Sequence, residues 1–151
     1  MRWLTRRSPY PVLVLLASCG GNAHLAAVGG TVTLDGQPLA NAFVVFCPTE
    51  TGTTSYGKTD ADGHYRMMFK DSEPGAWIGE SLVRISTGDL GAGGKAGPRE
   101  RVPVVYNTKT TLKVVVQPGK NRFDFDLQSN AGKIQLSHLR GGIAPANKGN
   151  P

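Results

Sequence analysis

Phe123-Asp124-Phe125-Asp126-Leu127 is the stretch of this 151-residue chain that decides its fold class. Apolar and charged residues alternate strictly through it, with the period of a β-strand that buries one face and exposes the other to water. The turn residues Gln117-Pro118-Gly119-Lys120-Asn121 precede it, and a second apolar alternation, residues 112–116, precedes the turn. Two such strands joined by a turn predict a β-hairpin.

The same period of two recurs along the rest of the chain, and no long helical period accompanies it. It predicts further strands at residues 31–34, 41–47, 52–58, 64–69 and 81–87. The third of these segments, 52–58, is polar and is expected at a sheet edge. The predicted fold is therefore all-β, a seven-stranded antiparallel β-sandwich. The side chains expected inside it are Val32, Leu34, Ala42, Val44, Phe46, Tyr65, Met67, Phe69, Val83, Ile85, Leu112, Val114, Val116, Phe123, Phe125 and Leu127.

The N-terminus has the features of a bacterial export signal. Three arginines stand within the first seven residues, an apolar run follows at 12–17, and that run is too short for a membrane span of about 20 residues. The tetrapeptide Leu16-Ala17-Ser18-Cys19 resembles the lipobox of bacterial lipoproteins, which implies that Cys19 is acylated and becomes the first residue of the mature chain. We expect an exported protein, anchored by lipid to the cell membrane or outer membrane, that faces the periplasm or the surface.

Two alternatives remain for this signal. An unlipidated signal peptide would leave Cys19 and Cys47 as two free thiols, whereas lipidation leaves Cys47 without a disulfide partner. The sequence Thr5-Arg6-Arg7 hints at a twin-arginine signal, although the residues after it are less apolar than that motif requires. Gly20 follows Cys19 where some inner-membrane lipoproteins carry Asp, which favours the outer membrane.

The chain divides into four predicted parts. Residues 1–18 are the lipoprotein signal peptide, 19–27 a tether, 28–127 the β-sandwich and 128–151 a C-terminal extension that is partly disordered. The 133 residues that remain after signal removal suffice for one domain.

Charge is distributed unevenly along the mature chain. Residues 19–94 hold 4 basic and 8 acidic side chains, and residues 95–151 hold 10 basic and 3 acidic ones. A basic region of this kind favours an anionic partner or membrane surface, although a solvated loop and tail explain it as well. Nucleic acid is not expected as a partner, because no recognition-helix pattern, RNA-binding signature or zinc-finger spacing is present.

Several stretches together resemble the carboxypeptidase regulatory-like domain. Val28-Gly29-Gly30-Thr31-Val32-Thr33-Leu34-Asp35-Gly36-Gln37-Pro38-Leu39 is similar to its opening motif, and Thr59-Asp60-Ala61-Asp62-Gly63-His64-Tyr65 to its central turn. Ala42-Phe43-Val44-Val45-Phe46-Cys47-Pro48 resembles its second strand, and the hairpin at 117–127 resembles its end. The resemblance implies a transthyretin-like (prealbumin-like) sandwich of Greek-key type. Members of this family are mostly non-catalytic modules, so no catalytic residues carry over.

Chemistry-bearing residues do not form a recognisable site in the sequence. None of His24, His64 and His138 has a second ligand at metal-binding spacing. Asp60 and Asp62 are too few for calcium, and turn formation explains them more simply. No serine lies in a nucleophile-elbow pattern. We therefore expect no enzyme activity, no cofactor and no metal.

The predicted strand at 41–47 has an unusual outer face, formed by Phe43, Val45 and Cys47. An exposed apolar face can mark a partner surface. Three outcomes are open: cover by the C-terminal extension, which we favour, self-association or a partner, and plain exposure. The apolar residues of the extension are Ile134, Leu136 and Leu139.

These features favour a non-enzymatic, lipid-anchored module that mediates protein interaction at the bacterial cell envelope. The alternative is a glycan-binding accessory lipoprotein that serves a separate hydrolase or transporter. The partners are thus the membrane, through the lipid, and an unknown envelope protein or glycan. Trp77 and Tyr106, aromatic residues on predicted loops, are further candidates for the contact surface, and ordinary packing is the simpler explanation for both. The candidate sugar-binding pairs are Trp77 with Glu80 and Tyr106 with Asn107.

Overall fold

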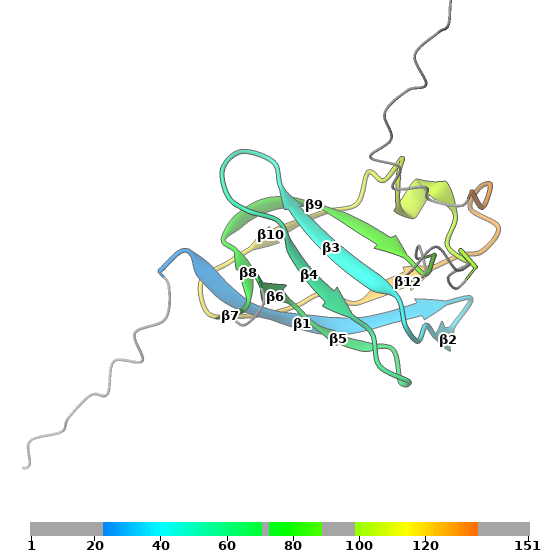
Figure 1. Ribbon diagram of the computed structural model, residues 1–151, viewed down its shortest axis with the longest axis horizontal. Coiled ribbons are helices and arrows are strands. Elements are labelled where there is room, and N and C mark those ends of the chain that lie inside the picture. The colour runs from blue at the N-terminus through cyan, green and yellow to red at the C-terminus, as the bar shows by residue number, and fades with distance from the viewer. Residues whose placement is uncertain (1–22, 71–72, 89–98, 136–151) are drawn as a thin grey trace, which may run out of the picture.

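The computed structural model describes residues 23–70, 73–88 and 99–135. Within them the chain is all-β, and a 3-10 helix, η2, is the short helical element (Figure 1). Cys19, Leu136, His138 and Leu139 lie outside the described residues. The elements are β1 Leu25–Leu34, β2 Gln37–Pro38, β3 Phe43–Pro48, β4 Ser55–Lys58, β5 His64–Arg66, β6 Met68–Phe69, β7 Glu73–Pro74, β8 Ala76–Trp77, β9 Gly79–Ser86, η2 Val104–Tyr106, β10 Lys113–Val116, β11 Lys120–Arg122 and β12 Phe125–Leu127.

The first sheet is organised around β1, its longest strand. Three short strands pair antiparallel with one side of β1 at successive positions: β8 near its start, β5 at its middle and β2 at its end. On the other side, β11 and β12 run parallel to it. The prediction of a purely antiparallel sandwich is therefore wrong for this sheet, because the last two strands return along β1 in the same direction.

The strand predicted at 122–127 is interrupted in its middle. The amide of Phe123 donates to the carbonyl of Gly29, and the amide of Thr31 donates to the Asp124 carboxylate at 2.8 Å instead of to a backbone carbonyl. A side chain thus replaces one bond of the ladder and divides the stretch into β11 and β12. The described residues form twelve strands where seven were predicted, because two predicted strands are each divided in two and the short strands β2, β7 and β8 were not predicted.

The second sheet has the order β10-β9-β3-β4-β6-β7 and is antiparallel throughout. The polar segment predicted at an edge supplies β4, which lies between β3 and β6, so that prediction is wrong. Small inward-facing residues explain its central position. Ser55 is buried, and a Cβ on Gly57 would lie 2.6 Å from the carbonyl oxygen of Arg66.

The chain crosses between the two sheets at Met67 and at Gly75. Met67 separates β5, in the first sheet, from β6, in the second, and its amide donates to the carbonyl of Val28 at 2.9 Å. Gly75 separates β7 from β8 in the reverse direction, with φ +130° and its Cβ position 2.8 Å from the carbonyl oxygen of Ala26. These crossings join the sheets along one side, which gives a sandwich-like arrangement.

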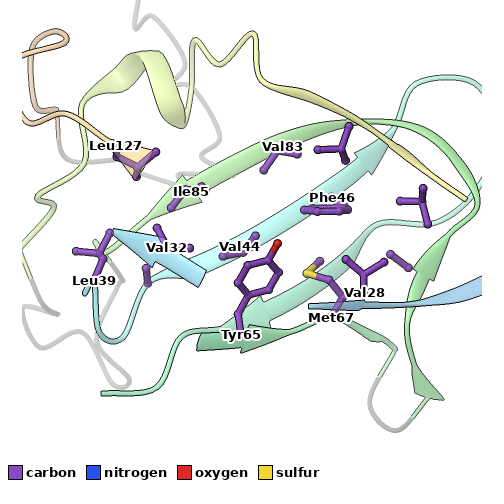
Figure 2. Packing of buried hydrophobic residues seen from close by; sticks show 14 of the residues in the cluster. Val28, Val32, Leu39, Val44, Phe46, Tyr65, Met67, Val83, Ile85 and Leu127 are labelled. Atoms are coloured by element: carbon purple, nitrogen blue, oxygen red, sulfur yellow. The ribbon is translucent and has the colours of Figure 1, made fainter. Parts of the chain in front are cut away.

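The core lies between the two sheets. Figure 2 shows side chains from both sheets pointing into this layer, with Phe46, Tyr65 and Met67 near its middle. The predicted inward positions are confirmed for most strands. The half-buried exceptions at the border of the core are Leu34, Leu112, Phe123 and Phe125.

The predicted tether ends earlier than expected, because β1 begins at Leu25. Leu25 pairs with Trp77, and Ala26 pairs with Ala76 and is 4% exposed. An alanine-rich segment is a poor sequence signal for a strand, yet a small side chain fits the narrow space beside β8. The last three residues assigned to the tether therefore belong to the sandwich.

Two carboxylates on the outer face of the first sheet join β1 to the last strands. Asp124 accepts a hydrogen bond from the Thr31 hydroxyl at 2.7 Å, and Asp126 accepts one from the Thr33 hydroxyl at 2.6 Å. Hydrogen bonds from Thr31 and from Arg122 lower the pKa of Asp124 below its usual value. The two aspartates of the stretch 123–127 thus face water and also link the end of the chain's sandwich to β1.

Because the pKa of Asp124 is lower in the folded state, its contribution to stability is complete above the unfolded pKa of about 4 and is lost as the pH falls further. We expect Asp124→Asn to flatten the decrease in the urea midpoint between about pH 5 and pH 2. Thr31→Val should flatten it in part, and Thr31→Ser, which keeps the hydroxyl, should not. Parallel midpoint curves for Asp124→Asn and the unmodified protein would contradict this prediction.

Candidate interaction surface

The outer side of the second sheet carries a group of apolar side chains on neighbouring strands. Phe43, Val45 and Cys47 of β3 are half-buried on this side, while their neighbours in sequence face the core. The register places Tyr56 and Arg84 on either side of Val45, and Leu82 beside Cys47. We define the outer apolar face as Phe43, Val45, Cys47, Tyr56, Met68, Leu82 and Val115.

Two members of the outer apolar face are exposed large side chains. Tyr56 is 45% exposed and Val115 is 51% exposed. Cys47 is a free thiol of intermediate exposure. An apolar surface spread over five neighbouring strands is a feature that typically marks an interaction site.

The described part of the C-terminal extension does not cover this face. The amide of Val104 donates to the carbonyl of Lys133 at 2.9 Å, which holds the extension against η2. Ile134, the next residue, is 50% exposed. Ile134 therefore does not cover the outer face of β3 as predicted. The other two residues expected to cover it, Leu136 and Leu139, lie outside the described residues.

Trp77 lies away from the outer apolar face and is a packing residue. Its ring stacks on His24 with centroids 5.3 Å apart and contacts the ring of Phe69 at 5.9 Å. A Cβ on Gly52 would lie 2.6 Å from the indole, so the backbone at Gly52 also packs against the Trp77 ring. The carboxylate of Glu80, the candidate partner of Trp77 for a sugar, binds the Lys113 ammonium at 2.9 Å.

Tyr106 has a structural role in η2. Its side chain packs against the core, and its hydroxyl accepts a hydrogen bond from the amide of Gln128 at 3.3 Å. Asn107 is 2% exposed and donates to the carbonyl of Val102. The candidate pair Tyr106 and Asn107 is thus held by packing and hydrogen bonds, and of the predicted contact surface only the three β3 residues share one face.

The turn between β4 and β5 is held by Asp60. One of its carboxylate oxygens accepts hydrogen bonds from the amides of Asp62 and His64 at 3.0 and 2.9 Å. Gly63 follows with φ +78° and a Cβ position 2.6 Å from the carbonyl oxygen of Val32. The turn assignment for the aspartates is confirmed, and the described residues contain no group of three or more metal-ligating side chains.

A groove of about 970 Å³ lies where β4 and β5 diverge into different sheets. One wall carries Tyr56 and Lys58 of β4, and the other carries Arg66 of β5 and Arg122 of β11. Gly57 and Gly29 also line it, and β5 approaches both so closely that a Cβ at either would lie within 3 Å of one of its carbonyl oxygens. The sequence pattern gives no signal for this groove, since its walls come from strands far apart in the chain.

Tyr65 closes the inner side of the groove and is not available for proton transfer. Its hydroxyl donates to the carbonyl of Phe123 at 2.7 Å. Burial, and secondly the nearby Asp124 carboxylate, raise the pKa of this phenol well above its usual value. It is therefore a neutral structural donor at physiological pH.

No protein-family model and no curated protein matches the chain. Among solved structures, the chain is similar to the crystal structure of a DUF3823 family protein from Parabacteroides merdae, at 16% sequence identity and a TM-score of 0.37. The match covers 70% of this chain and 47% of that protein, so the chain spans about half of its length. No helix in the described residues is long and apolar enough to cross a membrane.

Proposed function

We propose that this protein is a non-enzymatic, lipid-anchored β-sandwich of the bacterial cell envelope and that it mediates protein interaction. In this proposal Cys19 carries the lipid, and the sandwich is of the carboxypeptidase regulatory-like, transthyretin-like Greek-key type. The observation that carries the interaction role is the outer apolar face, which the described part of the extension leaves open.

The composition of this face suits a protein partner. Aliphatic and aromatic side chains predominate on it, Arg84 stands directly beside Val45, and Lys58 and Lys113 occupy neighbouring outward positions. Protein interfaces are likewise enriched in aromatic residues, Met and Arg. Tyr56 is a residue type that often carries a large share of binding energy.

Site-specific photo-crosslinking in intact cells of the native host tests this role. A photoreactive residue at Val45 or Val115 should give a crosslink to the same envelope protein, and one at Gln37, an exposed residue of β2 in the first sheet, should not. Val115→Asp should abolish the crosslink from position 45, because a carboxylate on the outer apolar face opposes burial. Equal crosslinking from all three positions, or none, would contradict the proposal.

The glycan-binding alternative rests on a different observation. The sugar-binding pairs suggested by the sequence already have other contacts. Trp77 stacks on His24, Glu80 pairs with Lys113, and Asn107 binds a backbone carbonyl beside Tyr106. The groove between β4 and β5 instead places an exposed aromatic residue beside several cations. An accessory role toward a separate hydrolase or transporter would use this groove.

A further inference from the structure

The groove between β4 and β5 is strongly cationic. Lys58, Arg66, Lys70 and Arg122 line it, and Asp60 is the one acidic residue of its lining. The Asp60 carboxylate already accepts two backbone hydrogen bonds. Among the described residues, Lys58, Arg66 and Lys70 form no ion pair, whereas Arg122 binds Asp124 at 2.9 Å. Three cations of the groove therefore have no carboxylate partner in the part of the chain that is described.

The cationic surface continues beyond this groove. A second, smaller hollow shares Phe43 and Lys58 with it and adds Arg99 and Arg101. The Lys58 ammonium lies 5.3 Å from the centre of the Phe43 ring, at the boundary between the two hollows. The two adjoining hollows form a cationic band, suited to a ligand with repeated negative charges.

The shape of the band distinguishes among anionic ligands. A flat bilayer surface would not follow two hollows with walls drawn from two sheets. Tyr56 offers an exposed ring beside the cations, and the C–H face of a sugar packs on such rings. Charge and ring together favour a polymer that contains both carboxylates and sugar rings.

We propose that this groove binds an acidic glycan, a polysaccharide that carries uronic-acid carboxylates. Lys58 and Arg66 bind its carboxylates from opposite walls, and the Tyr56 ring packs on a sugar unit between them. Phe43, Tyr56 and Met68 belong to both the groove and the outer apolar face, whereas Val45, Leu82 and Val115 do not line the groove. Val115→Asp therefore changes the outer apolar face alone and Arg66→Gln changes the groove alone, so the two kinds of binding can still fail separately.

Titration calorimetry with galacturonate oligosaccharides tests the proposal on the mature chain. Lys58→Gln/Arg66→Gln should weaken binding by on the order of tenfold or more. Lys109→Gln/Lys133→Gln is the matched control, since it removes the same charge from exposed lysines outside the groove and should leave the affinity within about twofold. Tyr56→Ala should weaken binding without any change in net charge.

Three further results would overturn the proposal. Equal losses in the two double variants would show non-specific attraction by net charge. Binding of polyglutamate as tight as that of galacturonate and insensitive to Tyr56→Ala would assign the groove to an acidic peptide. Binding to phosphatidylglycerol vesicles but not to galacturonate would assign it to the membrane. Neutral galactose oligosaccharides should not bind, and urea midpoints of all variants verify that each remains folded.

Discussion

Glu100→Ala is expected to lower the free energy of unfolding by about 3–5 kcal/mol. Glu100 is 6% exposed, and one of its carboxylate oxygens accepts hydrogen bonds from the amides of Thr87, Arg101 and Val102 at 2.9–3.0 Å. The hydroxyl of Thr87 donates to the same oxygen at 3.0 Å. Truncation leaves these donors buried without this acceptor, and an unsatisfied buried donor costs about 1–3 kcal/mol.

Urea unfolding, followed by the fluorescence of Trp77, measures this effect. Glu80→Ala is the control, because Glu80 is an exposed glutamate of β9 whose partner is the surface residue Lys113. Its midpoint should remain close to that of the unmodified protein. A midpoint for Glu100→Ala that equals the one for Glu80→Ala would show that the buried carboxylate does not hold the 99–102 segment to the end of β9.

Phe46→Ala is expected to cost about 3–5 kcal/mol of stability, because it leaves a cavity in the centre of the sandwich. Phe46 is 1% exposed on β3 and its ring lies 6.0 Å from that of Phe123 and 6.4 Å from that of Phe125. These contacts join the second sheet to the strands that return along β1. Loss of the ring therefore weakens packing between the layers as well as burial.

Phe43→Ala is the matched control for this prediction. Phe43 is the same residue type on the same strand, but it is half-buried on the outer apolar face. Its removal should cost about 1–2 kcal/mol, in keeping with partial burial. Equal losses for Phe43→Ala and Phe46→Ala would contradict the assignment of inner and outer faces, and with it the outer apolar face.

The period of two identified the strands and their inner faces because burial on a sheet repeats with the pleat. Val44, Phe46 and Val83 are buried as the pattern predicts. The pattern did not reveal pairing between distant strands. The parallel course of β12 beside β1 depends on Asp124 and Asp126 bonding to threonines 93 positions earlier, and such a contact leaves no local signal.

The part of the candidate surface that lies on β3 was predicted because side chains alternate between the two faces of a strand. Alternation alone placed Phe43, Val45 and Cys47 on one outer face, whereas Trp77 and Tyr106 were selected by residue type. Residue type does not reveal whether an aromatic side chain is covered by other rings or by the core. The cationic groove escaped prediction because Lys58, Arg66 and Arg122 meet only after the chain crosses between sheets.

An intact mass of the mature protein, extracted from the membrane fraction of its native host, tests the proposed lipid-anchored envelope role most directly. The proposal predicts a chain that begins at Cys19 and carries added diacylglycerol. A soluble, unmodified chain, or one that begins at another residue, would contradict the anchor. The outer apolar face and the cationic groove would then belong to a secreted module with a free thiol at Cys47.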